Sequence, residues 1–162
     1  MKPRIDWLRA APTVVQAMFG LQAPLNDSGL EHPLLELVKM RASQINGCAY
    51  CLDMHTKDAL AAGETAQRLF LLDAWREAPL YSARERAALA WTEALTLVTE
   101  GHVPDAVFEQ AHAQFSDAEL AKLTLAVIAI NGWNRLAVPF RAEVGSYQAG
   151  TAEAAAAARA SA

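Results

Sequence analysis

Two cysteines and a histidine lie close together in the segment Cys48-Ala-Tyr-Cys51-Leu-Asp-Met-His55. They are the only two cysteines in the chain. A cysteine pair at this spacing can cycle between dithiol and disulfide, or it can bind a metal ion together with a nearby histidine. This segment therefore carries most of what the sequence says about function.

A helix that begins at or near Cys48 would bring these three side chains together. Cys51 and His55 are four residues apart, so they would lie on one helix face, about 6 Å apart along the axis. Cys48 would lie about 4.5 Å before Cys51 along the axis, within the distance that a disulfide can close. His55 would lie about 10.5 Å from Cys48, so it is better placed to accept a proton from Cys51.

Two physical effects disagree about which sulfur is the nucleophile. The helix N-terminus stabilises an anion and can lower a thiol pKa from about 8.5 to about 3.5–7.5, which favours Cys48. A directional proton acceptor also gives general-base help, which favours Cys51. We interpret Cys51 as the attacking thiol and Cys48 as the resolving thiol that closes the disulfide.

The imidazole of His55 needs a partner that orients it, as in other assisted nucleophiles. Glu36 lies twelve residues before Cys48, on a preceding helix that the pair Asn46-Gly47 interrupts. An antiparallel pairing of the two helices would bring Glu36 back towards the histidine. Spacing alone leaves Glu31 and Asp53 as alternatives.

The rest of the chain predicts an all-α domain of about six to seven helices, because apolar residues recur at helical spacing and no alternating strand pattern recurs. We expect one domain over residues 1–150, followed by a frayed or disordered alanine-rich tail over 151–162. Ser82 with Glu85, and Ser116 with Glu119, have capping-box spacing. The expected helices cover about 7–20, 33–44, 48–63, 65–76, 82–99, 104–114 and a long last segment from 116.

Composition limits the partners and the cellular location that we expect for this chain. The net charge of −4 gives no electrostatic reason to expect nucleic acid or an anionic membrane as a partner. The start of the chain lacks a signal-peptide core, and the apolar stretch 123–130 is too short to span a bilayer. We therefore expect a cytoplasmic protein, in which a working redox pair or a metal site is favoured over a static disulfide. The last long helix is apolar nearly all round, which predicts that a neighbouring protomer covers it.

The run from Glu36 through Asn46-Gly47-Cys48 to Cys51 and His55 resembles the signature of AhpD-like alkylhydroperoxidases in the carboxymuconolactone decarboxylase superfamily. The resemblance is strong over about 20 residues and looser in the helical remainder. It implies an all-helical fold assembled as a homotrimer or homohexamer, with peroxidase or disulfide-reductase activity. It also implies a proton relay from Glu36 through His55 to Cys51, with Cys48 as resolving thiol.

The resemblance further implies a small hydroperoxide as substrate and an external dithiol, such as a lipoyl-bearing protein, as electron donor. The sequence requires no metal, flavin or nicotinamide cofactor. The chain departs from the family at Tyr50, where characterised alkylhydroperoxidases have a histidine. A tyrosine is a poor base near neutral pH.

Two other functions use the same residues. A metal-binding module would take Cys48, Cys51 and His55 as ligands, with Glu36 as a possible fourth. A redox sensor would form the disulfide with peroxide without catalytic turnover.

Overall fold

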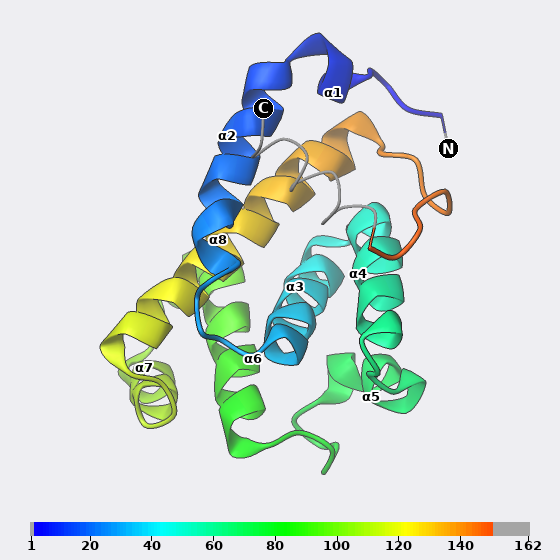
Figure 1. Ribbon diagram of the computed structural model, residues 1–162. Coiled ribbons are helices and arrows are strands. Elements are labelled where there is room, and N and C mark those ends of the chain that lie inside the picture. The colour runs from blue at the N-terminus through cyan, green and yellow to red at the C-terminus, as the bar shows by residue number, and fades with distance from the viewer. Residues whose placement is uncertain (1, 151–162) are drawn as a thin grey trace.

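The chain folds into α-helices joined by short turns (Figure 1). The computed structural model describes residues 2–150, and it contains no strand in that range. The α-helices are α1 (Trp7–Ala10), α2 (Pro12–Gln22), α3 (His32–Asn46), α4 (Ala49–Ala61), α5 (Ala66–Phe70), α6 (Ala83–Thr96), α7 (Asp105–His112) and α8 (Asp117–Phe140). Three short 3-10 helices are η1 (Ala23–Leu25), η2 (Leu72–Ala74) and η3 (Val98–Glu100). The all-α prediction is confirmed. The predicted tail, 151–162, lies outside the described residues.

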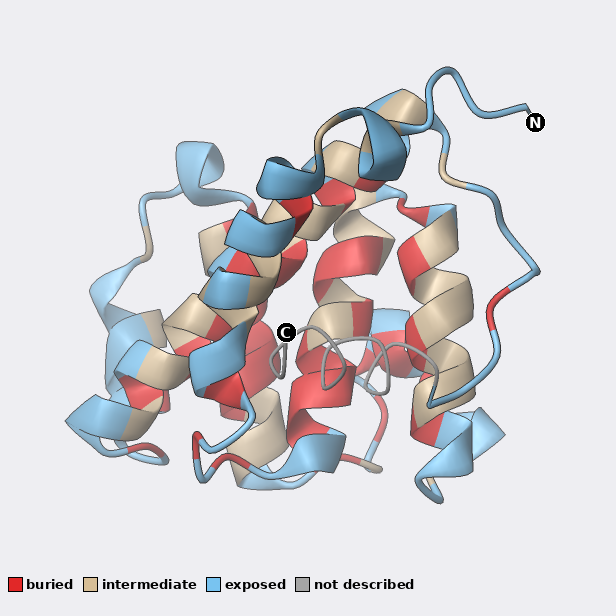
Figure 2. Ribbon diagram, turned by 45° about the horizontal axis from the view of Figure 1, so that its top comes forward, coloured by how far each residue is buried: buried red, intermediate tan, exposed pale blue. Residues whose placement is uncertain are grey.

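Helix α3 occupies the centre of the fold, in contact with α4, α6 and α8 (Figure 1). Eight of its fifteen residues are buried, and buried segments gather on the faces that these helices turn toward one another (Figure 2). Helix α2 packs along α8, and α7 packs mainly against α6. A central α3 means that any side chain on its buried face is held by three neighbouring helices.

Local sequence signals fix the helix ends near the cysteines. Gly47 follows α3 with φ of +64°, a left-handed conformation that glycine adopts without steric cost. Cys48 then becomes the N-cap of α4, one residue before the helix. The predicted capping boxes at Ser82 and Ser116 are both formed, each with its glutamate three residues on. The Gly47 turn is what makes α4 run back antiparallel to α3.

Two predicted helices are each divided. The segment 7–20 is α1 and α2, because Ala11 precedes Pro12 and a residue before proline is pushed out of the helical region. The segment 65–76 is α5 followed by η2. There, Leu72 and Trp75 are buried against the core, and η2 contacts α3. Packing of these two side chains takes the place of a continued helix.

Helix α8 is the long apolar helix that the sequence predicts. Its buried side chains face α2, α3, α4 and α6, whereas Ile128 is 52% exposed. Among residues 2–150, α8 alone is long and apolar enough to cross a membrane, judged by length and composition only. Its contacts with the other helices are typical of the core helix of a folded domain. Coverage of Ile128 by a second protomer stays a prediction.

Candidate dithiol site

Cys48 and Cys51 form a disulfide at the start of α4, with their Cα atoms 5.4 Å apart. Cys48 is the N-cap residue, and its Sγ accepts a hydrogen bond from the backbone N–H of Cys51 at 3.4 Å. One helical turn therefore brings the sulfurs together, as the spacing predicts. The free N–H groups of the same turn would stabilise a thiolate on Cys48 once the bond is reduced.

Both cysteines are buried, with 1% of Cys48 and 2% of Cys51 exposed. They belong to a small apolar cluster at the junction of α3, α4 and α8, formed with Ala42, Ile130 and Ala137 and flanked by Tyr50 and Ala142. With so little of either cysteine exposed, a reactant cannot reach the sulfurs unless the residues that cover them move. Access is therefore a physical requirement of any chemistry at this disulfide.

Neutral amides hold the turn that carries the disulfide. Asn46 donates from Nδ2 to Oδ1 of Asn134 at 2.8 Å and to Oδ1 of Asn131 at 3.0 Å. Asn134, which is 1% exposed, donates in turn to Oγ of Ser43 at 3.1 Å. The N–H of Cys48 donates to the carbonyl of Ser43 at 3.0 Å. This network fixes the α3–α4 turn against α8, and its outer end at Asn131 accepts from the guanidinium of Arg135 at 2.9 Å.

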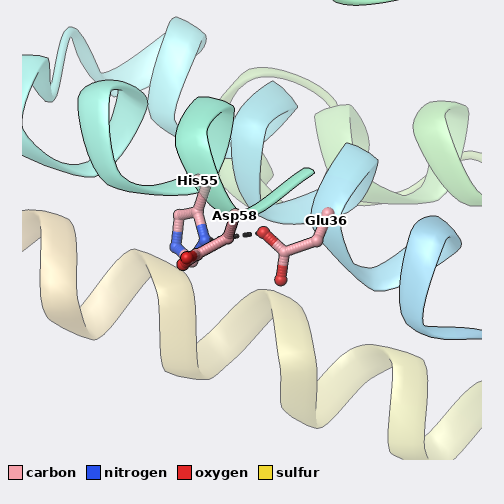
Figure 3. Close-up of side chains that lie close together, drawn as sticks. All are labelled: Glu36, His55 and Asp58. Atoms are coloured by element: carbon pink, nitrogen blue, oxygen red, sulfur yellow. Dashed lines mark hydrogen bonds and ion pairs between the residues drawn. The ribbon is translucent and has the colours of Figure 1, made fainter. Parts of the chain in front are cut away.

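The carboxylate of Glu36 reaches from α3 to the imidazole of His55 on α4 (Figure 3). Nδ1 of His55 lies 2.8 Å from Oε2 of Glu36, and both side chains are buried. Lys39 donates to the other carboxylate oxygen at 2.7 Å. Nε2 of the exposed His32 lies 3.8 Å from that same oxygen. The site thus combines one buried anion, one ammonium and two imidazoles, of which that of His55 is buried.

Of the three carboxylates that the spacing left open, the structure brings only Glu36 to His55. Glu31 instead pairs with Arg84 at 2.9 Å. Asp53 pairs with Lys57, one turn further along α4, at 2.9 Å. The register of α3 against α4 decides between Glu36 and Glu31, because it places the second turn of α3 beside the middle of α4.

The pKa of Glu36 is lowered to about 2. Burial acts in the opposite direction and is the largest single effect, but the hydrogen bonds and charges of His55 and Lys39 together outweigh it. Glu36 is therefore ionised near neutral pH and accepts the Nδ1 proton of His55. When the imidazole is neutral and keeps its proton on Nδ1, its lone pair lies at Nε2, which is the atom that can take a proton from a thiol.

Within residues 2–150, no hydrogen bond joins His55 to either sulfur in this disulfide form. Cys51 and His55 nevertheless lie one turn apart on α4. Proton transfer between them belongs to the reduced form, in which the Cys51 side chain is free to rotate. The geometry supplies a base at the correct spacing but not a preformed hydrogen bond.

Sequence reasoning missed Asp58. Its carboxylate lies beside Glu36 and His55, with one ligand atom from each of the three within 4.8 Å of the others (Figure 3). Among the described residues, this is the one group that has the composition to hold a metal ion, and it does not include the cysteines. Lys39 already supplies a positive charge to Glu36. The available signal was that Asp58 follows His55 by three residues on the same helix face.

Tyr50 lies between the cysteines and is half-buried. Burial, and then the charges of Asp53 and Asp58, raise the pKa of its hydroxyl. The hydroxyl therefore stays protonated at neutral pH and does not act as a base there. His55 is the base that the site offers.

A cavity of about 170 Å³ lies on the far side of Glu36 from the disulfide turn. It lies between the start of α3, the end of α4 and α5, and its lining residues are Pro33, Glu36, Leu37, Ala59, Ala62, Gly63, Glu64 and Arg68. The cavity gives the buried carboxylate a route for proton exchange with solvent.

The sequence model of the carboxymuconolactone decarboxylase family matches residues 10–94, which contain Glu36, both cysteines and His55. The chain belongs to this family. The matched region runs from α2 through most of α6 and ends before α8. The segments that cover the disulfide from the C-terminal side thus lie outside the part that the family model matches.

Similar proteins extend the comparison over most of the chain. YdfG of Bacillus subtilis, an uncharacterised protein, is 37% identical over 138 residues, which are 85% of this chain and 94% of YdfG. YnjA of Escherichia coli, also uncharacterised, is 32% identical over 60% of this chain and 53% of YnjA.

Solved structures agree with the fold. One is a protein of unknown function from Agrobacterium tumefaciens, whose description names it AhpD and links it to antioxidant defence. It superposes with a TM-score of 0.87 and 44% identity. The superposition covers 90% of this chain and all of that chain. The debrominase Bmp8 superposes with a TM-score of 0.73 at 17% identity, over 86% of this chain and 75% of Bmp8, which shows a shared fold alone.

Proposed function

We propose that this protein is a thiol-dependent peroxidase that reduces a small hydroperoxide and cycles through the Cys48–Cys51 disulfide. The observation that carries the proposal is the pairing of a disulfide at the first turn of α4 with a buried Glu36–His55 hydrogen bond on the same two helices. The antioxidant role in the description of the Agrobacterium tumefaciens protein supports the same reading.

In the first step the thiol of Cys51 gives its proton to Nε2 of His55. The thiolate attacks the terminal oxygen of the hydroperoxide, an S–O bond forms and the O–O bond breaks. The leaving alkoxide takes the proton from His55 and departs as an alcohol, so that Cys51 is a sulfenic acid. Glu36 holds the imidazole and stabilises its protonated form during this transfer.

In the second step the thiol of Cys48 attacks the sulfur of the sulfenic acid, the S–S bond forms, and water leaves. An external dithiol then exchanges twice with the disulfide, returns both thiols and becomes a disulfide itself. Each cycle moves two electrons from the dithiol to the peroxide. A lipoyl-bearing protein is the proposed donor, and the proposed setting is a cytoplasmic homotrimer or homohexamer.

Thiol counting tests the proposal. The reduced protein is expected to lose two thiols on addition of one equivalent of peroxide, and to consume peroxide repeatedly when dihydrolipoamide is supplied. Cys51→Ser is expected to abolish turnover. Peroxide consumption by Cys51→Ser at the parent rate would remove the assignment. Loss of two thiols without turnover would leave the redox sensor.

A second experiment ranks the two sulfurs. A thiol reagent that forms a stable mixed disulfide is expected to be trapped on Cys51 in the Cys48→Ser variant, and not on Cys48 in the Cys51→Ser variant. The reverse result would make Cys48 the nucleophile, as its N-cap position favours. Stoichiometric zinc in protein purified without chelator would support the metal-binding alternative.

A further inference from the structure

The disulfide is covered on every side in the described fold, although the proposed function requires an external dithiol to reach it. Thiol–disulfide exchange needs a thiolate to approach one sulfur in line with the S–S bond. With 1% and 2% of the two cysteines exposed, that approach is blocked. One of the covering elements therefore has to move in each catalytic cycle.

The covering elements differ in how firmly they are held. Ala42 belongs to α3, and Ile130 and Ala137 belong to α8; both helices are central to the core. Ala142 instead belongs to the C-terminal strap, which we define as residues 142–150. The strap leaves the end of α8 and returns to the outer side of α4 (Figure 1). Tyr50, the other flanking residue, belongs to α4 itself. The strap is therefore the one covering segment that can leave without opening the core, with the loss of one backbone hydrogen bond from Ala142 to the carbonyl of Ala137 at 3.0 Å.

Most of the strap is exposed. Tyr147 is its only buried residue and Ala142 is half-buried, so the strap runs along the surface with a single buried stretch (Figure 2). Local opening with few buried apolar contacts costs much less free energy than global unfolding. The strap therefore has the packing expected of a segment that opens while the helices stay folded.

Side-chain and backbone hydrogen bonds attach the strap to three residues of α4, Asp53, Lys57 and Asp58. The hydroxyl of Tyr147 donates to the carboxylate of Asp58, with both oxygens at 2.9 Å, and the N–H of Gly150 lies 3.2 Å from the same carboxylate. Lys57 donates to the carbonyl of Tyr147 at 3.0 Å. The N–H of Gly145 donates to Asp53 at 3.1 Å. All these partners are on the helix that carries the disulfide.

We propose that the C-terminal strap is a gate over the disulfide, and that the contact of Tyr147 with Asp58 is its latch. This proposal rests on the proposed function and specifies how its reductant gains access. When the latch opens, Ala142 leaves the cysteine cluster, and a compact dithiol on a flexible arm approaches the sulfurs. When the latch closes, the disulfide is shielded from bulkier protein thiols.

Asp58 links the gate to the proton relay, because its carboxylate also lies within 4.8 Å of ligand atoms of Glu36 and His55. A change at Asp58 would therefore disturb both the gate and the relay. The hydroxyl of Tyr147 bonds to Asp58 and can be removed without changing Asp58 itself, so Tyr147 is the better probe of the gate.

The test compares two tyrosine variants. Tyr147→Phe removes the latch hydroxyl and keeps the ring. Tyr81→Phe is the matched control, since Tyr81 is also buried (7% exposed, against 9% for Tyr147) and donates one hydroxyl hydrogen bond, to the carbonyl of Arg68. The rate at which dihydrolipoamide reduces the oxidised protein is measured for each. We expect Tyr147→Phe to be reduced about tenfold faster than the parent, the effect of losing a hydrogen bond to a charged group. Tyr81→Phe is expected to keep the parent rate.

Equal reduction rates for the parent and a folded Tyr147→Phe would overturn the gate. Equal acceleration in both variants would overturn it too, because the effect would then be general loosening. If Tyr147→Phe does not fold, Lys57→Met replaces it, since Lys57 donates to the same strap. Reduction of the disulfide is measured without peroxide, so the gate and the peroxidase assignment fail independently.

Discussion

Two glutamates on neighbouring helices, the buried Glu36 and the half-buried Glu93, show how partners decide the role of a carboxylate. Glu36 on α3 is hydrogen-bonded to the imidazole of His55 and the ammonium of Lys39, and the imidazole of His32 lies 3.8 Å away. Glu93 on α6 accepts from the indole N–H of Trp75 at 2.8 Å and from two guanidiniums. For both glutamates, burial raises the pKa and the partners outweigh it, so that the pKa is lowered.

The difference lies in what the partners do with protons. Guanidinium groups keep their protons throughout the physiological range, so Glu93 can only tie α3, α6 and the η2 region together. An imidazole changes charge between pH 5 and 8, so the partner of Glu36 can take up and release a proton. A lowered carboxyl pKa is thus common to a structural hub and a candidate relay, and only the partner distinguishes them.

Loss of the imidazole is expected to have the largest effect. His55→Gln should lower the rate of peroxide consumption by the reduced protein about 10³-fold at pH 7, because the general base is removed. His112→Gln is the control, since His112 is exposed and pairs with Asp117 at the surface. Similar rates for the two variants would show that His55 is structural, like the partners of Glu93.

Lowering the pH should remove the contribution of Glu36 to the free energy of unfolding. Its pKa is lowered from 4.5 to about 2, so the unfolded chain binds the proton more tightly than the folded protein does. The contribution, about 3 kcal/mol, is fully present above about pH 4.5 and is lost as the pH falls toward 2. Urea midpoints measured from pH 5 to 2 should fall less steeply in Glu36→Gln than in the parent. Parallel curves would mean that Glu36 is not a paired anion.

Matched amide substitutions at Glu36 and Glu93 distinguish a role in proton transfer from a structural role. Glu36→Gln should lower the peroxidase rate about 30-fold, less than loss of the imidazole, because His55 loses its anionic partner but keeps its lone pair. Glu93→Gln should leave the rate within about twofold and lower stability by about 3 kcal/mol, since two guanidiniums lose their carboxylate. The measurements are initial rates and urea unfolding on the same preparations. A rate loss in Glu93→Gln equal to that in Glu36→Gln would break the contrast.

The smallest expected effect is at Tyr50. The hydroxyl there remains protonated, so Tyr50→His would add a second base beside the sulfurs, as in the alkylhydroperoxidases that the chain resembles. We expect a peroxidase rate about threefold higher near pH 7. Tyr50→Phe, measured alongside, should keep the parent rate. A faster Tyr50→Phe would mean that the hydroxyl hinders the reaction instead.

Much of the fold follows from local signals in the sequence. The capping boxes at Ser82 and Ser116 and the turn at Gly47 are each specified by a few neighbouring residues, and they form as predicted. The break before Pro12, which the predicted helix over 7–20 lacked, was nevertheless legible from the sequence. The division of the segment 65–76 was not, because it depends on where Leu72 and Trp75 meet α3.

The site was predictable where its members share one helix. The spacing of Cys48, Cys51 and His55 is a property of α4 itself. The choice of Glu36 over its alternatives depends on the register between two helices, which spacing does not determine. The contact between Asp58 and Tyr147 joins residues 89 apart in the chain. No sequence pattern predicts where the strap packs against α4.

Cys48, Cys51 and His55 all belong to a single helix, α4, or to its N-cap. Peptide geometry sets the distance between them, whereas the anion that tunes the imidazole is contributed by a different helix. Thermal separation of α3 from α4 would leave the oxidisable pair correctly spaced and deprive it of its acid–base partner. A molecule damaged in this way would still become oxidised by peroxide, but only slowly.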